Sequence, residues 1–151
     1  MPTSVPAGTG YVAGAILSTV FLFVYQIRLT SKWRRISGIE YPRAYADKEE
    51  MNANPNAVVF NCAQRAHQNT IENIIAIYPM TLITSIKHPY ITAAAVGLWT
   101  LSRLSYTRGY VTGDPQKRYT FISVLHYPII TGHMLACVYV VGQLIYEELT
   151  L

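Results

Sequence analysis

The distribution of charge is the feature that most restricts how this chain can fold. Asp, Glu, Lys and Arg are absent from four stretches, residues 1–27, 73–86, 88–102 and 119–146. Uncharged apolar segments of roughly 18 residues or more are typical of transmembrane helices, and the first and last stretches are long enough. The two middle stretches are shorter, so each must include a flanking charged residue to cross a bilayer. We therefore predict an integral membrane protein.

The composition agrees with this prediction and leaves no room for a soluble domain. Of the 151 residues 51% are hydrophobic, and 13% are charged, where a soluble domain has about 25%. The predicted fold is all-α, a single four-helix membrane bundle. Its four spans are expected at about 11–27, 57–86, 90–110 and 119–146, with a long loop over residues 37–56.

Basic residues are concentrated in two of the predicted loops. Six lie between the first and second spans, namely Arg28, Lys32, Arg34, Arg35, Arg43 and Lys48. Three more, Arg108, Lys117 and Arg118, lie between the third and fourth spans, whereas the opposite side carries only Lys87. By the positive-inside rule both basic loops face the cytosol. The net charge of +4 is thus explained by topology, and we expect no nucleic-acid partner.

A first polar stripe lies at the start of the second span. Arg65, Asn69 and Glu72 are spaced i, i+4, i+7 and fall within about 60° of one another on one helix face. A helix of this segment's length exceeds the roughly 30 Å of the hydrocarbon core, so its first part projects toward the cytosol. The spacing alone does not distinguish a ligand site from a buried Arg–Glu pair that neutralises itself and fixes helix packing.

A second polar stripe, Arg103, Tyr106 and Tyr110, lies on the third span. Taken alone, its tyrosines are equally typical of the aromatic belt at a membrane interface. The predicted topology, however, brings both stripes to the same depth as Arg34, Arg35, Lys117 and Arg118. Positive charge there exceeds what Glu72 can neutralise. This surplus favours an anionic ligand held by charge-assisted bonds, such as a small peptide with carboxylates and an ammonium group.

Two histidines and a cysteine are candidates for other chemistry. His126 and His133 are seven residues apart on the fourth span, where a metal or haem ligand pair is conceivable. No partner histidine is expected at matching depth on another span, so hydrogen bonds between helices are the favoured role and no metal site is predicted. Cys62, close to the Arg65 stripe, is interpreted as a small packing residue.

Three ordered motifs resemble the MAPEG family, the membrane-associated proteins of eicosanoid and glutathione metabolism. They are Glu40-Tyr41-Pro42, Q-R-A-H-Q-N-T-I-E at 64–72 and R-L-S-Y-T-R-G-Y-V-T-G-D-P-Q-K-R at 103–118. The resemblance covers residues 28–118 and is strongest to the microsomal glutathione S-transferase type 3 branch. It implies a homotrimer of the endoplasmic reticulum or nuclear envelope, with glutathione as co-substrate bound between neighbouring subunits near the cytosolic face.

The resemblance also implies a function and its residues. The expected activity is that of a membrane glutathione transferase and glutathione-dependent peroxidase, acting on a lipophilic electrophile or a lipid hydroperoxide. Glutathione contacts are expected from Arg34, Arg65, His67, Asn69, Glu72, Tyr106, Tyr110 and Lys117. Arg118, with Tyr110, is the expected catalytic residue that activates the thiol; Lys117 is the alternative, because the family position is ambiguous by one residue. In related proteins the glutamate of this motif is followed within a few residues by an aromatic residue and a proline. Here Glu72 is followed instead by Asn73-Ile74-Ile75.

Two other functions are compatible with parts of this pattern. A non-catalytic lipid-binding scaffold of the same family would lack the glutathione residues, which this chain retains. A small transporter would place its ionisable groups near the membrane midplane, whereas here they are expected at one end. Catalysis is therefore the favoured interpretation.

Overall fold

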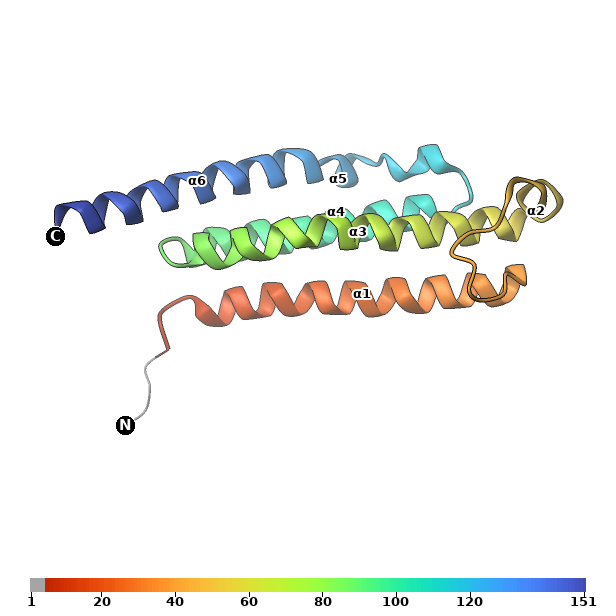
Figure 1. Cartoon of the computed structure of the whole chain (residues 1–151), viewed down its shortest axis with the longest axis horizontal. Helices are drawn as coiled ribbons and strands as arrows, with labels where there is room; N and C mark the ends of the chain where they lie inside the picture. The colour runs from red at the N-terminus through yellow and green to blue at the C-terminus, as the bar shows by residue number, and fades with distance from the viewer. Residues whose placement is uncertain (1–4) are drawn as a thin grey trace.

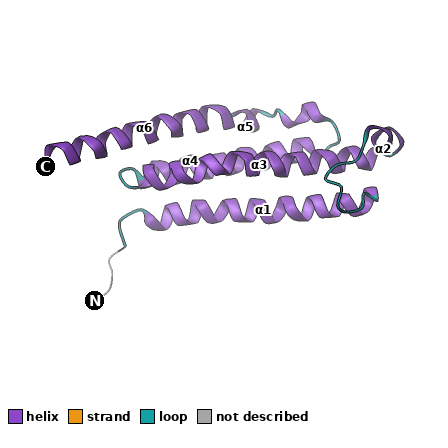
Figure 2. Cartoon of the chain, in the orientation of Figure 1, coloured by secondary structure: helices purple, strands orange, loops and turns teal. Residues whose placement is uncertain are grey.

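The computed structural model describes residues 5–151, and within this range every regular element is a helix (Figure 2). The predicted all-α class is therefore confirmed. Four helices are long: α1 (Thr9–Ser37), α3 (Pro55–Ser85), α4 (Pro89–Tyr110) and α6 (His126–Thr150). Three elements are short: α2 (Lys48–Ala53), the 3₁₀ turn η1 (Pro115–Arg118) and α5 (Phe121–Val124).

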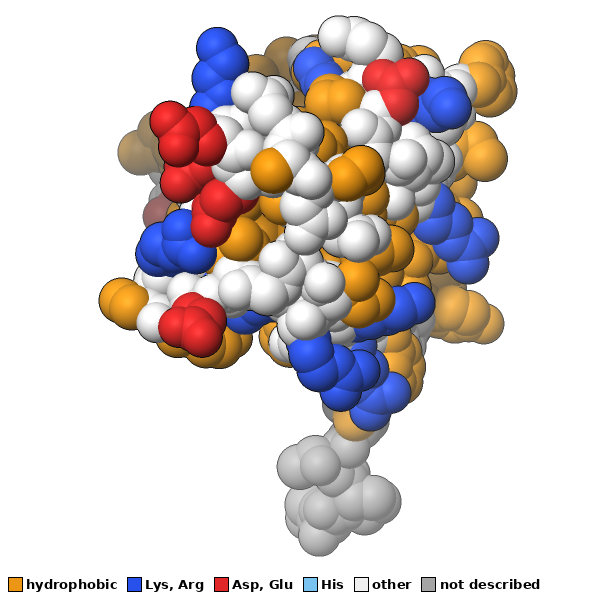
Figure 3. All heavy atoms as spheres, turned by 90° about the vertical axis from the view of Figure 1, so that its right-hand side faces the viewer, with side chains coloured by type: hydrophobic (Ala, Val, Ile, Leu, Met, Phe, Trp, Pro, Cys, Tyr) orange, Lys and Arg blue, Asp and Glu red, His pale blue; other side chains and the backbone are white. Residues whose placement is uncertain are grey.

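The four long helices lie side by side, and α3 and α4 separate α1 from α6 (Figure 1). The start of α1 and the end of α6 lie at one end of the molecule, and α2 and η1 lie at the other (Figure 1). We call the end that carries α2 and η1 the basic end. Figure 3 views this end directly, and charged side chains of both signs gather around its edge.

Among residues 5–151, two segments are long and apolar enough to cross a membrane, α1 and the stretch Phe121–Thr150 that comprises α5 and α6. Only 22% and 11% of their most apolar windows are buried within the chain. Large side chains such as Phe21 and Leu135 are instead 66% and 61% exposed. Apolar surface on this scale needs hydrocarbon or another protein around it, which agrees with a membrane protein. The crossing of the membrane by α3 and α4 stays a prediction.

Local sequence explains where α1 ends and where α3 begins. Gly38 follows α1 with a left-handed φ of 75°, and its N–H donates to the Arg34 carbonyl at 3.0 Å. Glycine adopts this conformation without the strain that a Cβ brings. At the start of α3, the Asn54 side chain accepts from the Asn56 N–H at 3.0 Å, and Pro55 occupies the first turn.

The connection between α1 and α3 contains a helix where the sequence suggested only loop. In α2, Asp47 accepts from the Glu50 N–H at 2.8 Å, and Glu50 accepts from the Asp47 N–H at 2.9 Å. This reciprocal capping box stabilises a single short turn of helix.

The fourth helical segment, predicted over residues 119–146 with a kink at Pro128, is not one continuous helix. It begins at Phe121 and is interrupted at Leu125 before α6. The interruption follows from Pro128, which has no N–H to donate and whose ring crowds the carbonyl of the residue four positions earlier, the last of α5. The 3₁₀ turn η1, which precedes this segment, positions Arg118.

The interior contains many threonines beside a small apolar core. Ile74, Ile77, Val96 and Trp99 pack together between α3 and α4. Thr70, Thr81, Thr84, Thr92 and Thr107 are also buried, and each hydroxyl donates to the carbonyl four residues earlier at 2.7–3.0 Å. Small hydroxyl residues that satisfy themselves in this way permit close helix packing in an apolar environment.

Candidate functional site

The two polar stripes lie on either side of one cavity near the basic end. Its volume is about 380 Å³, and residues from α3, α4, η1 and α6 line it. The predicted residues among its lining are Arg65, Asn69, Tyr106, Tyr110 and Arg118. Positions that are far apart in sequence thus form one polar hollow, as the shared depth of the two stripes suggested.

The pair formed by Arg65 and Glu72 is not a buried ion pair. The Arg65 Nη1 lies 2.9 Å from the Glu72 Oε1, and the side chains are 42% and 45% exposed. Asn69 donates to the other carboxylate oxygen at 3.4 Å. Exposed pairs of this kind contribute only about 0–1 kcal/mol to stability. Helix packing therefore does not explain these residues, and the Arg65 guanidinium remains accessible to a ligand.

Arg103 is the most deeply buried cation of the cavity, with an exposed fraction of 2%. Its Nη2 donates to the Asn69 Oδ1 at 2.7 Å, and its Nε donates to the Thr70 Oγ1 at 3.4 Å. The guanidinium carbon lies 4.0 Å from the centre of the Tyr106 ring. None of the three ion pairs within residues 5–151 involves Arg103.

A buried guanidinium with only neutral partners lacks the counter-charge that usually compensates its desolvation. Arg103 therefore gives the cavity a strong preference for an anion. Sequence analysis placed Arg103 in the second stripe but not among the ligand contacts. Its i, i+3 spacing from Tyr106 was the signal that could have identified it.

The tyrosines of α4 connect Arg103 to Arg118. The rings of Tyr106 and Tyr110 are stacked with their centres 5.4 Å apart, and the Arg118 guanidinium carbon lies 5.4 Å from the Tyr110 ring centre. Arg118 is fixed by its own turn, because it donates to the Pro115 carbonyl at 2.6 Å and to the Tyr119 Oη at 2.8 Å. The cation therefore stands at a defined position beside Tyr110.

The structure separates Arg118 from its neighbour Lys117. Arg118 lines the cavity, whereas the Lys117 side chain is exposed and does not. The Lys117 backbone carbonyl packs directly against Gly109, where a Cβ would collide with it. The glycine of the Arg108-Gly109-Tyr110 sequence thus allows η1 to approach α4 closely enough to bring Arg118 to the cavity.

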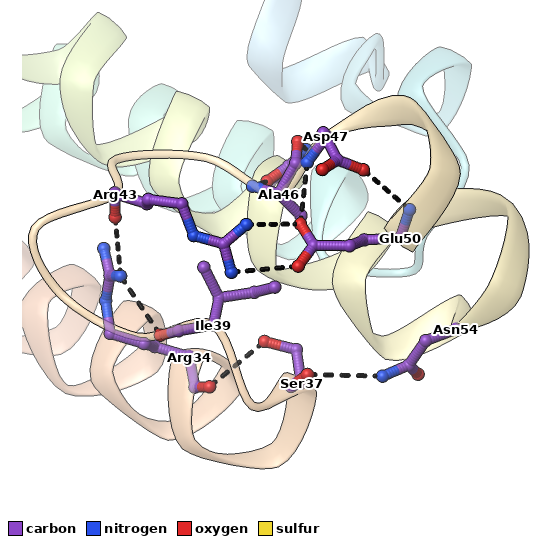
Figure 4. A network of polar contacts seen from close by, with 9 residues as sticks. Arg34, Ser37, Ile39, Arg43, Ala46, Asp47, Glu50 and Asn54 are labelled. Atoms are coloured by element: carbon purple, nitrogen blue, oxygen red, sulfur yellow. Dashed lines mark hydrogen bonds and ion pairs between the residues drawn. The ribbon is translucent and has the colours of Figure 1, made fainter.

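Arg34 is not brought to this cavity within the chain. Figure 4 shows its guanidinium beside the loop that follows α1. Its Nη1 donates to the carbonyls of Ile39 at 3.3 Å and Arg43 at 2.7 Å, which holds the loop after α1 in place. Its guanidinium carbon also lies 4.2 Å and 4.6 Å from the ring centres of Tyr41 and Phe60. Together with Tyr41 it lines a separate hollow of about 370 Å³ at the same end.

His67 also lies outside the cavity. It faces α1, with its Nδ1 3.4 Å from the Gln26 Oε1 and its ring edge-on to Phe23. Gln26 in turn donates to the hydroxyls of Thr70 at 2.9 Å and Thr107 at 2.8 Å. A single chain therefore assembles the Arg65 and Arg118 parts of the predicted site but not Arg34, His67 or Lys117. Glu72 does not line the cavity either and reaches its edge only through the contact with Arg65.

Asn73, Ile74 and Ile75, the departure noted in the sequence, take three different positions. Asn73 lines the cavity, and its amide donates to the Asn69 carbonyl at 2.7 Å. Ile74 is buried in the core with Trp99, and Ile75 is 72% exposed on the outside of α3. The first of the three is therefore a site residue that sequence analysis missed.

The histidines of α6 have hydrogen-bond partners on other helices. The Trp99 indole donates to the His126 Nδ1 at 3.1 Å, so the neutral His126 ring carries its hydrogen on Nε2. His126 lines the cavity, together with Ser123 and Tyr127, which sequence analysis also missed. Within residues 5–151 no group of three His, Cys, Asp or Glu side chains is placed to hold a metal ion.

Comparison with models of known protein families identifies the family of this chain. The family model described as the MAPEG family matches residues 12–139. No solved structure matches the chain.

Proposed function

Since the chain belongs to the MAPEG family, we propose that it is a membrane-bound glutathione transferase that also reduces lipid hydroperoxides with glutathione. The family includes membrane glutathione transferases and peroxidases as well as members without enzymatic activity. The choice between them rests on the cavity, whose three arginines come from α3, α4 and η1.

The observation that carries the proposal is the buried Arg103, which lacks a carboxylate partner. Glutathione has two carboxylates, one ammonium group and a thiol. Arg65 and Arg103 suit its carboxylates, because guanidinium groups bind them with paired, charge-assisted hydrogen bonds. Glu72, which shares its carboxylate between Arg65 and Asn69, suits the ammonium group. A non-catalytic scaffold needs no such cluster of cations.

Arg118 is proposed to activate the thiol. A free thiol has a pKa near 8.5 and is mostly protonated at neutral pH. A guanidinium beside the sulfur favours the thiolate, which is the nucleophile, and arginine keeps its charge under all physiological conditions. The exposed position of Lys117 and the fixed position of Arg118 beside Tyr110 both support Arg118 in this role.

Two reactions follow from a thiolate at this position. With an electrophile, the sulfur forms a bond to carbon, and the displaced group leaves or the adduct takes up a proton. With a lipid hydroperoxide, the sulfur attacks the terminal oxygen and breaks the O–O bond, and the lipid leaves as an alcohol after protonation. The resulting sulfenic acid of glutathione then condenses with a second glutathione to give the disulfide and water.

Assembly and location follow the family resemblance and are part of the proposal. We propose a homotrimer in the endoplasmic reticulum or nuclear envelope with its basic end in the cytosol, as expected for the microsomal glutathione S-transferase type 3 branch. Arg34 and His67, which do not line the cavity of their own chain, would then serve glutathione bound at a neighbouring subunit.

The test is glutathione turnover with a hydrophobic electrophile and with a lipid hydroperoxide. Arg118→Ala is expected to lower turnover at least a hundredfold, because an electrostatic contact to the developing charge is worth roughly that factor. Lys117→Ala is the matched control, since it removes the adjacent cation that does not line the cavity.

Equal turnover by the Arg118 variant and the original protein would remove Arg118 from the mechanism. A folded original protein that neither turns over nor binds glutathione at millimolar concentration would favour the scaffold. Solute flux into liposomes without glutathione would favour a transporter.

A further inference from the structure

A second cavity lies between α3, α4 and α6, farther from the basic end. Its volume is about 390 Å³, and it shares no lining residue with the arginine-lined cavity. Its walls are almost entirely apolar, and the proposed reaction does not use them. We call it the α4–α6 groove.

Small residues create the α4–α6 groove. Ala94 and Ala95 line it from α4, and Gly132 and Ala136 line it from α6. A Cβ placed on Gly132 would meet no atom within 4 Å, so the space beside this residue is open. At the rim Ile91 is 68% exposed, so the groove opens to the outside of the chain.

One buried polar side chain in the groove has an unused hydrogen-bonding atom. His133 lines the groove and is 5% exposed. Its Nδ1 has no hydrogen-bond partner anywhere in the described part of the chain. Buried polar atoms are almost always paired, and an unpaired one costs roughly 1–3 kcal/mol. Such an atom in an apolar groove points to a ligand.

The neighbouring hydrogen bonds determine what kind of partner this nitrogen needs. The single hydroxyl hydrogen of Thr84 donates to the Met80 carbonyl at 2.7 Å. We assign the hydrogen between the Thr84 oxygen and the His133 Nε2, which are 3.0 Å apart, to the nitrogen, because this assignment leaves the Thr84 hydrogen bond to Met80 intact. In the neutral ring this leaves Nδ1 as a lone-pair acceptor. The missing partner is consequently a hydrogen-bond donor.

We propose that the α4–α6 groove binds a single-chain lipid that carries a neutral hydroxyl group, with the hydroxyl donating to the His133 Nδ1. The apolar walls and the absence of any Lys, Arg, Asp or Glu in the lining exclude a charged head group. The volume suits one unbranched chain rather than a two-chain phospholipid. This site is separate from the glutathione cavity and does not depend on glutathione chemistry.

The experiment is photolabelling of the full chain in phosphatidylcholine nanodiscs, whose lipid offers no hydrogen-bond donor. The probe is dodecan-1-ol with a diazirine midway along its chain. Its methyl ether, which keeps the oxygen but cannot donate, is the ligand control. We expect the alcohol to label peptides that contain 91–98 and 128–136 roughly three to ten times more than the ether, the factor that one neutral hydrogen bond gives.

Two substitutions on the same helix complete the test. Gly132→Leu fills the groove and is expected to abolish the preferential labelling. Gly142→Leu is the matched control, because this glycine also has open space around it but does not line the groove. Glutathione binding should be unchanged in both variants, which shows that they fold. Equal labelling by alcohol and ether, or labelling that survives Gly132→Leu, would overturn the proposal.

Discussion

Arg103 is the residue whose role the structure changes most. It is buried, its partners are Asn69, Thr70 and the Tyr106 ring, and none of them is anionic. A buried cation without a counter-charge is retained at a cost to stability. We therefore attribute Arg103 to ligand binding rather than to folding.

Arg103→Met separates these two roles. Because methionine fills a similar volume without charge, we expect an unchanged or higher melting temperature together with glutathione affinity lowered roughly 10- to 150-fold, the loss of one charge-assisted hydrogen-bonded contact. Thermal unfolding and titration calorimetry measure the two quantities. A variant that melts lower but binds glutathione normally would show that Arg103 is structural.

Glu50 provides a prediction on pH. Its carboxylate accepts from Arg43 at 2.9 and 3.0 Å and from the Asp47 N–H at 2.9 Å (Figure 4). The Arg43 hydrogen bond, followed by that backbone N–H, lowers the pKa of Glu50 below its ordinary value of 4.5. A lowered pKa means that the stabilisation is fully present above the ordinary value and is lost as pH falls through the lowered one.

We therefore expect the loop between α1 and α3 to loosen below about pH 4.5. Amide hydrogen exchange at Glu50 and Met51, corrected for the intrinsic pH dependence, measures this change. Glu50→Gln removes the titrating group and should remove the acid-induced step. A step of the same size in this variant would assign it to another carboxylate.

Among the secondary-structure elements, the 3₁₀ turn η1 determines whether Arg118 reaches the arginine-lined cavity. Because its Lys117 carbonyl packs against Gly109, any side chain at that position must displace the turn and Arg118 with it. Gly109→Ala should therefore lower kcat for glutathione turnover at least tenfold, since a small misplacement of a catalytic group is costly. Binding through Arg65 and Arg103 should change much less.

Gly97→Ala is the control on the same helix, because a Cβ at Gly97 meets no atom within 4 Å. It should leave kcat unchanged. Steady-state kinetics of both variants measures the effect. Equal kcat for Gly109→Ala and the original protein would mean that η1 does not position Arg118 for the reaction.

The sequence predicted the long helices better than their connections. Charge-free stretches and the basic residues beyond them indicated helices close to α1, α3 and α4, because charge is costly in hydrocarbon. The α2 turn depends on a capping box between Asp47 and Glu50, and the break at Leu125 depends on Pro128. Both are local features that hydrophobicity does not report.

The site was predictable to the extent that helical periodicity determines it. The stripes starting at Arg65 and Arg103 meet at one cavity because each follows a single helix face. Helical periodicity does not predict the contacts that depend on the loop after α1 or on α6. In the loop after α1, the carbonyls of Ile39 and Arg43 accept hydrogen bonds from Arg34 and so hold its side chain away from the cavity. The start of α6 brings Tyr127 to the cavity.

For the whole molecule, the exposed apolar surfaces of α1 and α6 agree with a protein that is completed by lipid or by other copies of itself.

The proposed trimer predicts that two inactive variants restore each other's activity when their chains assemble together. A site between subunits takes Arg118 from one chain and Arg34 from the next. Mixed assemblies of Arg118→Ala and Arg34→Ala should therefore regain about a quarter of the original activity when the chains mix randomly.

Co-expression of the two variants, followed by turnover per trimer, measures this recovery. Two copies of Arg118→Ala that carry different affinity tags are the control and should stay inactive. If each site lies within one chain, every site in the mixture keeps one defect and no activity returns.

In the proposed function this chain binds glutathione and holds it as a thiolate beside Arg118. Stopped-flow ultraviolet absorbance of the purified protein mixed with glutathione near pH 7 detects this thiolate. We expect a rapid thiolate signal that saturates with glutathione concentration, persists in Lys117→Ala and disappears in Arg118→Ala. Glutathione that binds without a thiolate signal, or an undiminished signal in Arg118→Ala, would contradict the account.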